Sequence, residues 1–312
     1  MKICVLGSKK STIKLLNFFF KNKIKVDTLV LIDPNKFNSI EISGHISSIS
    51  STAQMLGISC YFVETFSLKS QGDKNFFKEK TFDLGFCTSW QRIIPTDILN
   101  LFKFGVFGWH GSGYEFPNGR GRSPINWSIR LGLNSIFHNC FKYGAGPDDG
   151  DIYETRKIEI KREDYIDDVQ EKANKHICDS ALRLIDDINL NKLKLTKQIN
   201  QPFISFPKLN EKSGQLYPDL LRLESARNIV RSCSHPFPGA YIVLSDFDVK
   251  IRVWKAEIIS DENNNVNVDK GYLFLLNKDI FVGFSDGILK VTNYEIEKKN
   301  FVLPQKKNLK CI

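Results

Sequence analysis

The amino-acid sequence predicts an α/β fold, in which a doubly wound, Rossmann-like and mainly parallel sheet is followed by a small C-terminal β-barrel domain of the OB type. Apolar strand-like runs alternate with helix-period segments in the first half of the chain, and short strands without intervening helices follow residue 240. With 312 residues, 42% of them hydrophobic, the chain can bury a core in each domain. We expect the first domain over residues 1–191, a linker over 192–213 and the second domain over 214–312.

Strand and helix signals alternate along the first domain. The expected strands cover residues 3–6, 26–32, 60–63, 83–87 and 152–160. The expected helices cover residues 15–20, 47–56, 74–80 and 164–190, and one more begins at Pro124. Asp33-Pro34-Asn35 is a turn signal after the second strand. This alternation is typical of parallel strands joined by crossover helices.

The second domain is expected to begin with a helix from Leu220 through Val230, followed by a proline-rich turn at residues 234–240. Short strands are expected at residues 241–244, 250–254, 280–284 and 288–291, with a polar hairpin tip at 261–267. Several short strands separated by turn signals are typical of a small barrel.

The charge balance favours an anionic small molecule over a nucleic acid. The chain carries 44 lysine and arginine residues against 35 acidic ones, a formal charge of +9, but these basic residues are spread along the chain rather than gathered in one arm. We therefore expect no nucleic-acid partner. The sequence leaves open whether the chain forms a homo-oligomer.

The cysteines and the apolar segments indicate a cytoplasmic protein. Seven cysteines are scattered without a close pair such as CxxC, which disfavours both a disulfide framework and a zinc site, so we expect reduced thiols and no metal. The first residues enter a strand-like run without the pattern of a cleaved leader, and no apolar segment reaches membrane-spanning length.

Most of the unusual chemistry lies between Gly105 and Asp151. His110 is flanked by glycines and a serine rather than by apolar helix formers, so a loop is expected there. A glycine- and arginine-rich turn follows at residues 118–122, and the segment ends in the carboxylates Asp148, Asp149 and Asp151. A histidine and a carboxylate near one another would suit proton transfer.

The topology of a doubly wound sheet predicts where these residues meet. Ligands bind outside the carboxyl ends of the strands, where successive loops converge. Residues 89–92 and 108–110 each follow a strand-like run, so both should face one cleft. Gly7-Ser8 follows the first strand without a full GxGxxG pattern, and we therefore expect no dinucleotide.

Four ordered motifs resemble the formyltransferase family. Members carry an Asn-x-His-Gly/Pro-Ser signature, an Arg-Gly-x-x-Pro turn, a Leu-Asp-x-Gly-Asp element and an Asp-Pro-Trp-Pro-Gly-Ala-Phe turn to the second domain. The matching segments here are GWHGS at 108–112, RGRSPINW at 120–127 after Pro117, PDDGD at 147–151 and HPFPGAY at 235–241. The resemblance extends from the first strand to about residue 294.

The resemblance implies an enzyme that transfers a formyl group from 10-formyltetrahydrofolate to a primary amine through a tetrahedral intermediate. Its first domain would be catalytic, with His110 handling protons and Asp148 paired with it. The run at 120–127 is similar to that of the formyltransferase domain acting on UDP-4-amino-4-deoxy-arabinose. A nucleotide-linked amino sugar of polysaccharide biosynthesis is therefore the expected acceptor.

The expected ligand contacts follow from the same motifs and from the cleft. We expect 10-formyltetrahydrofolate to bind Trp90, Gln91, Arg92, Ile93 and Asp148. We expect the acceptor to bind Ser112, Arg120, Gly121 and Arg122, because a glycine-flanked arginine at a helix start can meet phosphate.

Two other activities of the family are alternatives for this chain. Methionyl-tRNA formyltransferases resemble the chain over the same length but carry a basic insertion in the first domain, which we do not find here. Formyltetrahydrofolate hydrolases resemble only the catalytic domain and carry a different amino-terminal domain. A catalytically weakened, formyltransferase-like binding protein is the third alternative.

One residue departs from the family pattern. The asparagine that helps to stabilise the developing oxyanion stands two residues before the histidine, and Gly108 occupies that position here. Loss of one such donor typically costs about 10²–10³ in rate. Either another donor replaces it, with Asn126, Asn139 and Ser112 as candidates, or a protonated His110 carries the charge, or the protein is a weakened relative.

Each of these residues also has a purely structural interpretation. A single histidine is more often structural than catalytic, the aspartates could simply shape a turn, and the arginines could be solvated. The tryptophans are expected to pack rather than to stack on ligands. We expect structural roles for the remaining histidines, which are His45, His138, His176 and His235.

Overall fold

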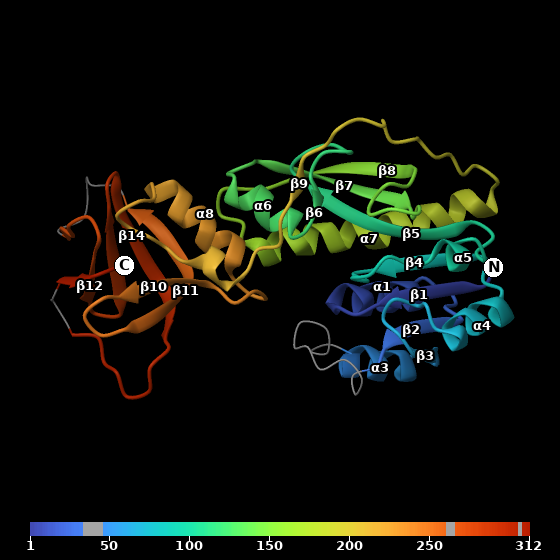
Figure 1. Cartoon of the computed structure of the whole chain (residues 1–312), viewed down its shortest axis with the longest axis horizontal. Coiled ribbons are helices and arrows are strands. Elements are labelled where there is room, and N and C mark those ends of the chain that lie inside the picture. The colour runs from blue at the N-terminus through green and yellow to red at the C-terminus, as the bar shows by residue number, and fades with distance from the viewer. Residues whose placement is uncertain (34–45, 260–265, 305–307) are drawn as a thin grey trace. The chain divides into compact units, whose positions relative to one another are not determined.

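The computed structural model describes residues 1–33, 46–259, 266–304 and 308–312 (Figure 1). Its contacts divide the chain into two compact units whose segments alternate in sequence. The N-terminal unit holds residues 1–120, 137–157 and 172–204, and the C-terminal unit holds 121–136, 158–171 and 205–312.

A seven-stranded sheet forms the frame of the N-terminal unit, in the order β3-β2-β1-β4-β5-β7-β8. Its strands are β1 (Ile3–Gly7), β2 (Thr28–Ile32), β3 (Ser59–Val63), β4 (Leu84–Thr88), β5 (Gly105–Ser112), β7 (Ser135–Lys142) and β8 (Ile152–Glu159). The first five in space run parallel, and β7 pairs with β5 in the antiparallel sense. The predicted mainly parallel, Rossmann-like sheet is thus confirmed.

Helices cover both faces of this sheet, and alternate residues of each strand enter the two cores. Helices α1 (Lys10–Lys21), α3 (Ile46–Met55) and α7 (Ile166–Asn189) contribute to one core, which also takes Ile3 and Val5 of β1. Helices α4 (Gln71–Lys80) and α5 (Thr96–Leu99) contribute to the other, which takes Cys4 and Leu6. The central strands are therefore buried on both sides.

The order of the strands switches direction at β1 and β4, whose carboxyl ends lie side by side. The chain passes from β1 outward to β2 and β3, then returns to pair β4 on the other side of β1. There the Ser8 hydroxyl donates to the carbonyl oxygen of Ser89 at 2.9 Å, and the hydroxyls of Thr12 and Thr88 lie 2.9 Å apart. Such a switch in strand order is where open α/β sheets bind ligands.

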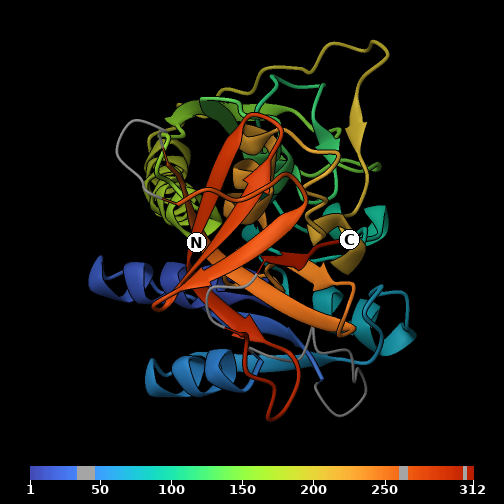
Figure 2. The same ribbon diagram turned by 90° about the vertical axis from the view of Figure 1, so that its left-hand side faces the viewer.

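The C-terminal unit contains a six-stranded antiparallel sheet in the order β10-β11-β14-β13-β12-β15. Its strands are β10 (Ala240–Leu244), β11 (Val249–Ile259), β12 (Tyr272–Leu276), β13 (Asp279–Phe284), β14 (Gly287–Ile296) and β15 (Asn308–Lys310). Leu244 at the end of β10 bridges Cys311 after β15, so the two edges of the sheet meet, as in the predicted small barrel. Figure 2 shows the strong twist of its orange and red strands.

Helix α8 (Leu223–Cys233) packs its apolar side into this curled sheet, where Ala226, Ile229 and Val230 join the core. Helix α6 (Pro124–Arg130) and the short strands β6 (Arg120–Gly121) and β9 (Ser205–Phe206) lie in or at the border of the same unit. A 3₁₀ turn, η1, covers Glu211–Gly214.

Several expected elements are shifted, and others were not expected. The helix predicted from Leu220 begins at Leu223, because residues 217–221 form a turn first. His110 was expected in a loop but lies on β5, because β7 pairs beside β5 and extends it past the parallel region. Helix α5 and strands β7, β12 and β15 were not predicted. Residues 34 and 35 of the expected turn and residues 261–265 of the expected hairpin tip lie outside the described residues.

Candidate functional site

His110 lies near the end of β5, with both ring nitrogens close to oxygen atoms of the protein. Its Nε2 lies 2.8 Å from the carbonyl oxygen of Gly119, and its Nδ1 lies 3.3 Å from Oδ2 of Asp148. The imidazole is buried, whereas the Asp148 side chain keeps 26% of its surface exposed. The structure therefore brings together the histidine and the aspartate that the sequence pattern pairs.

The neighbours of His110 indicate which protons the ring carries. A carbonyl oxygen only accepts, so Nε2 donates to Gly119. The other nitrogen faces a carboxylate, which also only accepts when ionised. Both contacts are satisfied together when both nitrogens are protonated, as in an imidazolium–carboxylate pair.

The loop that carries this acceptor is packed tightly against β5. Gly119 has a φ of +75°, and a Cβ there would lie 1.8 Å from the Ser112 hydroxyl oxygen, so only glycine fits. Ser112 itself is fully buried and accepts a hydrogen bond from the backbone of Tyr114 at 3.3 Å. Its hydroxyl is thus held under the loop.

Asp148 sits in a left-handed backbone conformation, with a φ of +53°, which aspartate tolerates better than most residues. The Gln198 side-chain amide fixes this loop by donating to the carbonyl oxygens of Asp148 at 2.9 Å and of Gly150 at 2.7 Å. Asp149 accepts from the backbone of Gly146 at 2.7 Å. The carboxylate of Asp148 is therefore positioned by a loop that is tied at several points.

Gly108, in the position of the family's asparagine, faces an aromatic ring. A Cβ at this residue would lie 2.2 Å from Cε1 and 2.5 Å from the hydroxyl oxygen of Tyr143. Val106, Gly108 and His110 share one face of β5, since side chains alternate along a strand. Tyr143 therefore occupies the space of a residue-108 side chain, on the face that carries His110.

The two asparagines suggested as substitute donors are engaged within the protein. The Asn126 amide is buried in the C-terminal unit and donates to the carbonyl oxygen of Ser232 at 2.8 Å. The Asn139 amide donates to the carbonyl oxygens of Phe137 at 3.3 Å and of His110 at 3.5 Å. Its side-chain oxygen accepts from Thr155 at 2.6 Å. Asn139 thus lies beside His110 but binds the backbone of the strands.

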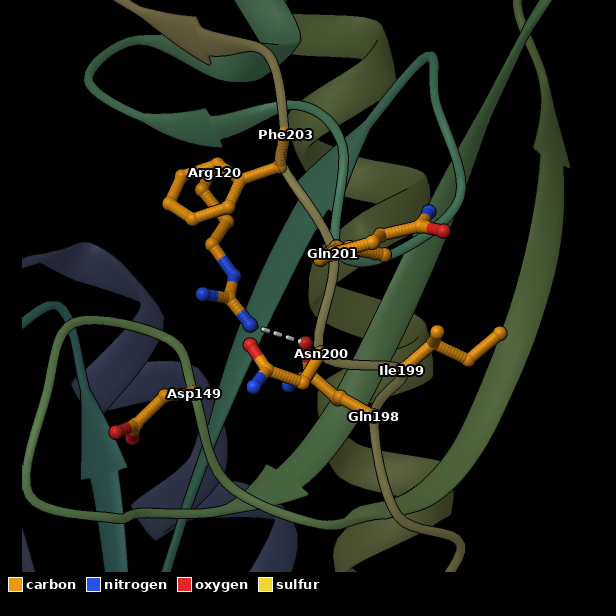
Figure 3. Close-up of a pocket in the computed structure, with 8 residues that line it drawn as sticks. Arg120, Asp149, Gln198, Ile199, Asn200, Gln201 and Phe203 are labelled. Atoms are coloured by element: carbon orange, nitrogen blue, oxygen red, sulfur yellow. Dashed lines mark hydrogen bonds between the residues drawn. The ribbon is translucent and has the colours of Figure 1, made fainter.

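A pocket of about 200 Å³ lies in the N-terminal unit next to this loop, lined by Pro117, Arg120, Asp149, Phe203 and residues 198–201 (Figure 3). The Arg120 guanidinium lies 4.6 Å from the ring centroid of Phe203 and donates to the side-chain oxygen of Gln198 at 2.6 Å. Its Nε is buried without a partner among the described residues. Figure 3 shows the Phe203 ring alongside Arg120, with Asp149 on a separate loop.

The other two expected acceptor contacts belong to the C-terminal unit. Gly121 lies against the backbone of Phe206, and the backbone N–H of Arg122 donates to the Phe206 carbonyl oxygen at 2.8 Å. The Arg122 side chain is exposed. Both residues are therefore anchored by β9 through their backbone.

The loop expected to bind the folate follows β4, where the strand order of the sheet switches. Trp90 is buried, with its ring edge-on to Phe66 at 5.1 Å, and its Nε1 has no hydrogen-bond partner among the described residues. Arg92 lies over the same Phe66 ring at 4.9 Å, Gln91 is half-buried and Ile93 is exposed. Trp90 therefore packs, as expected for a tryptophan, while leaving one buried donor free for a ligand.

A second histidine cluster lies on the neighbouring strand. His138 on β7 and His176 on α7 approach with their Nδ1 atoms 2.7 Å apart, and Nε2 of His176 lies 2.5 Å from Oε1 of Glu154. Burial holds the pKa of His138 well below its usual value and lowers the pKa of His176. Burial would raise the pKa of Glu154, but hydrogen bonds from His176 and Arg183 lower it to about 2.

Three contributors to the site were not predicted from the sequence. Tyr143, Gln198 and Phe203 carry no motif and reach the site only through the fold. Proximity of residue 143 to the aspartate motif was the one available signal. Within the described ranges, no cluster of histidine, cysteine or acidic residues could hold a metal ion. Among those same residues, no helix has the length and apolar character needed to cross a membrane.

Comparison with known proteins adds to this geometry. A model of the formyl transferase C-terminal domain matches residues 222–306. The bifunctional polymyxin resistance protein ArnA of Wigglesworthia glossinidia brevipalpis is 28% identical over 185 residues, which are 56% of this chain and 26% of that protein. The methionyl-tRNA formyltransferase of Prochlorococcus marinus (strain MIT 9515) is 24% identical over 314 residues, which are 96% of this chain and 94% of that protein.

A solved structure shows the same fold. The N-formyltransferase of Helicobacter canadensis, in complex with folinic acid and dTDP-3-aminofucose, superimposes with a TM-score of 0.65 at 15% identity. The superposition covers 95% of this chain and 100% of that one. The likeness therefore extends through both parts of the chain.

Proposed function

Because the chain belongs to the formyltransferase family, we propose that it moves a formyl group from 10-formyltetrahydrofolate to the primary amine of a nucleotide-linked amino sugar. One observation carries the catalytic part of this proposal. His110 and Asp148, which match the family's histidine and aspartate, lie 3.3 Å apart on a strand and a loop of one unit.

The residues at the crevice fit a reduced folate. The buried Nε1–H of Trp90 has no partner among the described residues, and a pterin or formyl oxygen could accept from it. The relative from Helicobacter canadensis holds folinic acid, a formylated reduced folate. In this chain, the segment from Trp90 to Ile93 would hold 10-formyltetrahydrofolate, which supplies the formyl group when bound.

The histidine and the aspartate suit the proton chemistry of amine attack. An amine that attacks a formyl carbon becomes positively charged and must lose a proton. A carboxylate beside an imidazole orients the ring and stabilises its charged form. We assign to Asp148 the role of first accepting the amine proton. We assign to His110 the roles of orienting that carboxylate and carrying the positive charge.

The pocket around Arg120 suits the anionic part of the acceptor. Its guanidinium has an unpartnered Nε, and Phe203 presents an exposed ring beside it. A phosphate can accept from a guanidinium, and an aromatic ring can stack on a base or a sugar face. The volume of about 200 Å³ fits part of a nucleotide sugar rather than the whole.

The Arg120 assignment predicts a binding defect. For Arg120→Ala we expect KM for the nucleotide sugar to rise about tenfold, with little change in kcat, because a charge-assisted hydrogen bond contributes ~1.5–3 kcal/mol. Arg156→Ala, which removes an arginine paired with Asp179 on the surface, is the matched control and should leave KM unchanged. Equal KM values in the two variants would contradict the assignment.

A second candidate function has an observation in its favour. The methionyl-tRNA formyltransferase of Prochlorococcus marinus matches nearly the whole of this chain and of itself, whereas the ArnA match covers about half of this chain. Initiator methionyl-tRNA is therefore the alternative acceptor. The dispersed positive charge and the lack of a recognised basic insertion favour the sugar.

The acceptor can be identified by direct competition. The protein is first screened by thermal shift against nucleotide-linked amino sugars, each with and without 5-formyltetrahydrofolate. Transfer from 10-formyltetrahydrofolate is then followed by mass spectrometry with UDP-4-amino-4-deoxy-arabinose, dTDP-3-aminofucose or initiator methionyl-tRNA. A formylated sugar supports the proposal, a formylated tRNA supports the alternative, and no product with any acceptor contradicts both.

A further inference from the structure

The place left by the missing asparagine is filled. A Cβ at Gly108 would lie within 2.2–2.5 Å of three atoms of Tyr143, including the hydroxyl oxygen. Real Cβ atoms do not approach other heavy atoms so closely, so any side chain at residue 108 would have to displace this ring. Gly108 and Tyr143 are therefore a matched pair: the small residue makes the room that the large one uses.

The backbone and the neighbouring side chains fix the tyrosine in this place. Its N–H donates to the Val106 carbonyl oxygen at 2.7 Å, which sets residue 143 beside β5. Its ring stacks on Phe141 at 5.3 Å, and it packs against the core that includes Cys87 and Trp90. A ring held on several sides is a pre-positioned group rather than a mobile one.

The hydroxyl lies within reach of both functional parts of the site. It hydrogen-bonds Cys87 on β4, a residue that pairs with Gly108 and also accepts from the backbone of Trp90. The charge of Asp148 also acts on it. The phenol is therefore near both the loop expected to hold the folate and the carboxylate paired with His110, so a formyl oxygen bound at this site would come close to it.

The protonation of Tyr143 suits a donor. Burial, followed by the effects of Cys87 and Asp148, raises its pKa well above the usual value, so the phenol keeps its proton across the working pH range. The sulfur that it contacts is a weak acceptor. An oxygen that gains negative charge is a stronger acceptor than this sulfur, so it would take over the hydrogen bond from the phenol.

We propose that Tyr143 is the catalytic residue that replaces the family's asparagine, its hydroxyl donating a hydrogen bond to the formyl oxygen as negative charge develops there. This inference rests on the proposed formyl transfer. The amine nitrogen bonds to the formyl carbon, the bond from that carbon to the folate nitrogen breaks, and the proton lost by the amine ends on that nitrogen. Tyr143 keeps its own proton throughout.

Removal of the hydroxyl tests the donor directly. With the acceptor found above, Tyr143→Phe should lower kcat by about 10²-fold and leave KM nearly unchanged, because the bond forms mainly in the transition state. The matched control is Tyr153→Phe, which removes a hydroxyl bonded to Asp187 on α7 and should keep the parental kcat. A folded Tyr143→Phe with parental kcat would overturn the proposal.

A swap of the two residues tests whether they share one role. Gly108→Asn alone should lower turnover, because the new side chain displaces the Tyr143 ring. Tyr143→Ala should lower kcat as Tyr143→Phe does. Adding Gly108→Asn to Tyr143→Ala should restore kcat about tenfold, because the asparagine then has both room and a function. A hundredfold rise in kcat from Gly108→Asn alone would show that no substitute donor exists.

A spectroscopic readout avoids turnover altogether. The carbonyl stretch of 5-formyltetrahydrofolate labelled with ¹³C in the formyl group can be followed by infrared spectroscopy when bound. We expect it at lower frequency in the parent and in Tyr153→Phe than in Tyr143→Phe, because a hydrogen bond weakens the carbonyl bond. Identical frequencies in all three proteins would count against Tyr143 even if every acceptor failed, which separates this test from that of the proposed function.

Discussion

Two histidine–carboxylate pairs lie on neighbouring strands of one sheet, and their surroundings give them different chemistry. His110 on β5 faces Asp148, and His138 on β7, opposite Gly111, leads through His176 to Glu154. A residue pair alone does not distinguish a reactive site from a structural one. The hydrogen-bond acceptors and donors around each imidazole ring distinguish the two.

The hydrogen bonds of the buried cluster are satisfied without charge on either ring. Glu154 accepts from Nε2 of His176, so the Nδ1 of a neutral His176 is an acceptor, and His138 can donate to it. This chain of donors agrees with the lowered pKa values of both histidines. His110, between two acceptors, is satisfied when it carries both protons. The two clusters therefore differ in their hydrogen-bond acceptors: the ring of His110 lies between two acceptors, whereas His138 and His176 bond to each other and to one carboxylate.

The largest expected effect follows from removing the imidazole ring of His110. His110→Ala should lower kcat of formyl transfer by about 10³-fold while the protein stays folded, because the imidazole is assigned to chemistry. The measurement is steady-state turnover together with circular dichroism. His235→Ala serves as control, because its ring stacks on Trp254 in the C-terminal unit. Near-parental turnover of folded His110→Ala would remove His110 from the mechanism.

Asp148 should show the next largest effect. Asp148→Ala removes most transfer, and Asp148→Asn, which keeps the shape without the charge, should lower kcat by about 10²-fold. Asp149→Asn is the matched control on the same loop, where the side chain accepts only from the Gly146 backbone. If Asp148→Asn and Asp149→Asn lose turnover equally, the charge at residue 148 has no special role.

The corresponding change in the buried cluster should affect stability instead. Glu154 accepts from His176 and from Arg183, so Glu154→Gln should lower the free energy of unfolding by ~1.5–3 kcal/mol in a urea titration. Turnover of the folded fraction should remain. Asp179→Asn, which disrupts a half-exposed pair with Arg156, should cost under ~1 kcal/mol. A large loss of turnover in folded Glu154→Gln would show that the buried cluster also contributes to formyl transfer.

The sequence predicts the first of these clusters because its residues stand in ordered motifs. The glycines around His110, the arginine turn and the aspartates lie at family spacing, and the apolar alternation places them at the carboxyl edge of a parallel sheet. The fold class and the resemblance to the formyltransferase family are both confirmed. The roles assigned to the individual residues stay predictions.

The remaining features of the fold and the site depend on contacts that no local sequence pattern indicates. Strand β7 is buried on both faces, so its side chains show no alternation of polar and apolar residues, and it was not predicted. Because the sequence does not predict β7, it also does not predict that pairing with β7 extends β5 through His110. The pairing of Gly108 with Tyr143 depends on the hydrogen bond from residue 143 to Val106, which composition does not reveal.

The smallest expected effect is the response of the buried cluster to mild acid. Burial lowers the folded-state pKa of His138 and of His176, whereas both titrate near ~6.5 when unfolded. Below that pH the unfolded chain therefore binds protons that the folded chain does not bind. The contribution of the two histidines to the free energy of unfolding is complete above about pH 6.5 and falls as the pH drops toward the folded-state pKa values. The slope approaches ~1.4 kcal/mol per pH unit for each such proton. Glu154, with a pKa of about 2, adds a second loss of stability below about pH 4.5.

Urea titrations from pH 7.5 to 5.5 should show the loss of stability that comes from the histidines in the parent and a smaller one in His176→Gln. Since that variant removes one of the two histidines, equal slopes in both proteins would mean that the buried cluster takes up its protons in the folded state, and the contrast with His110 would disappear.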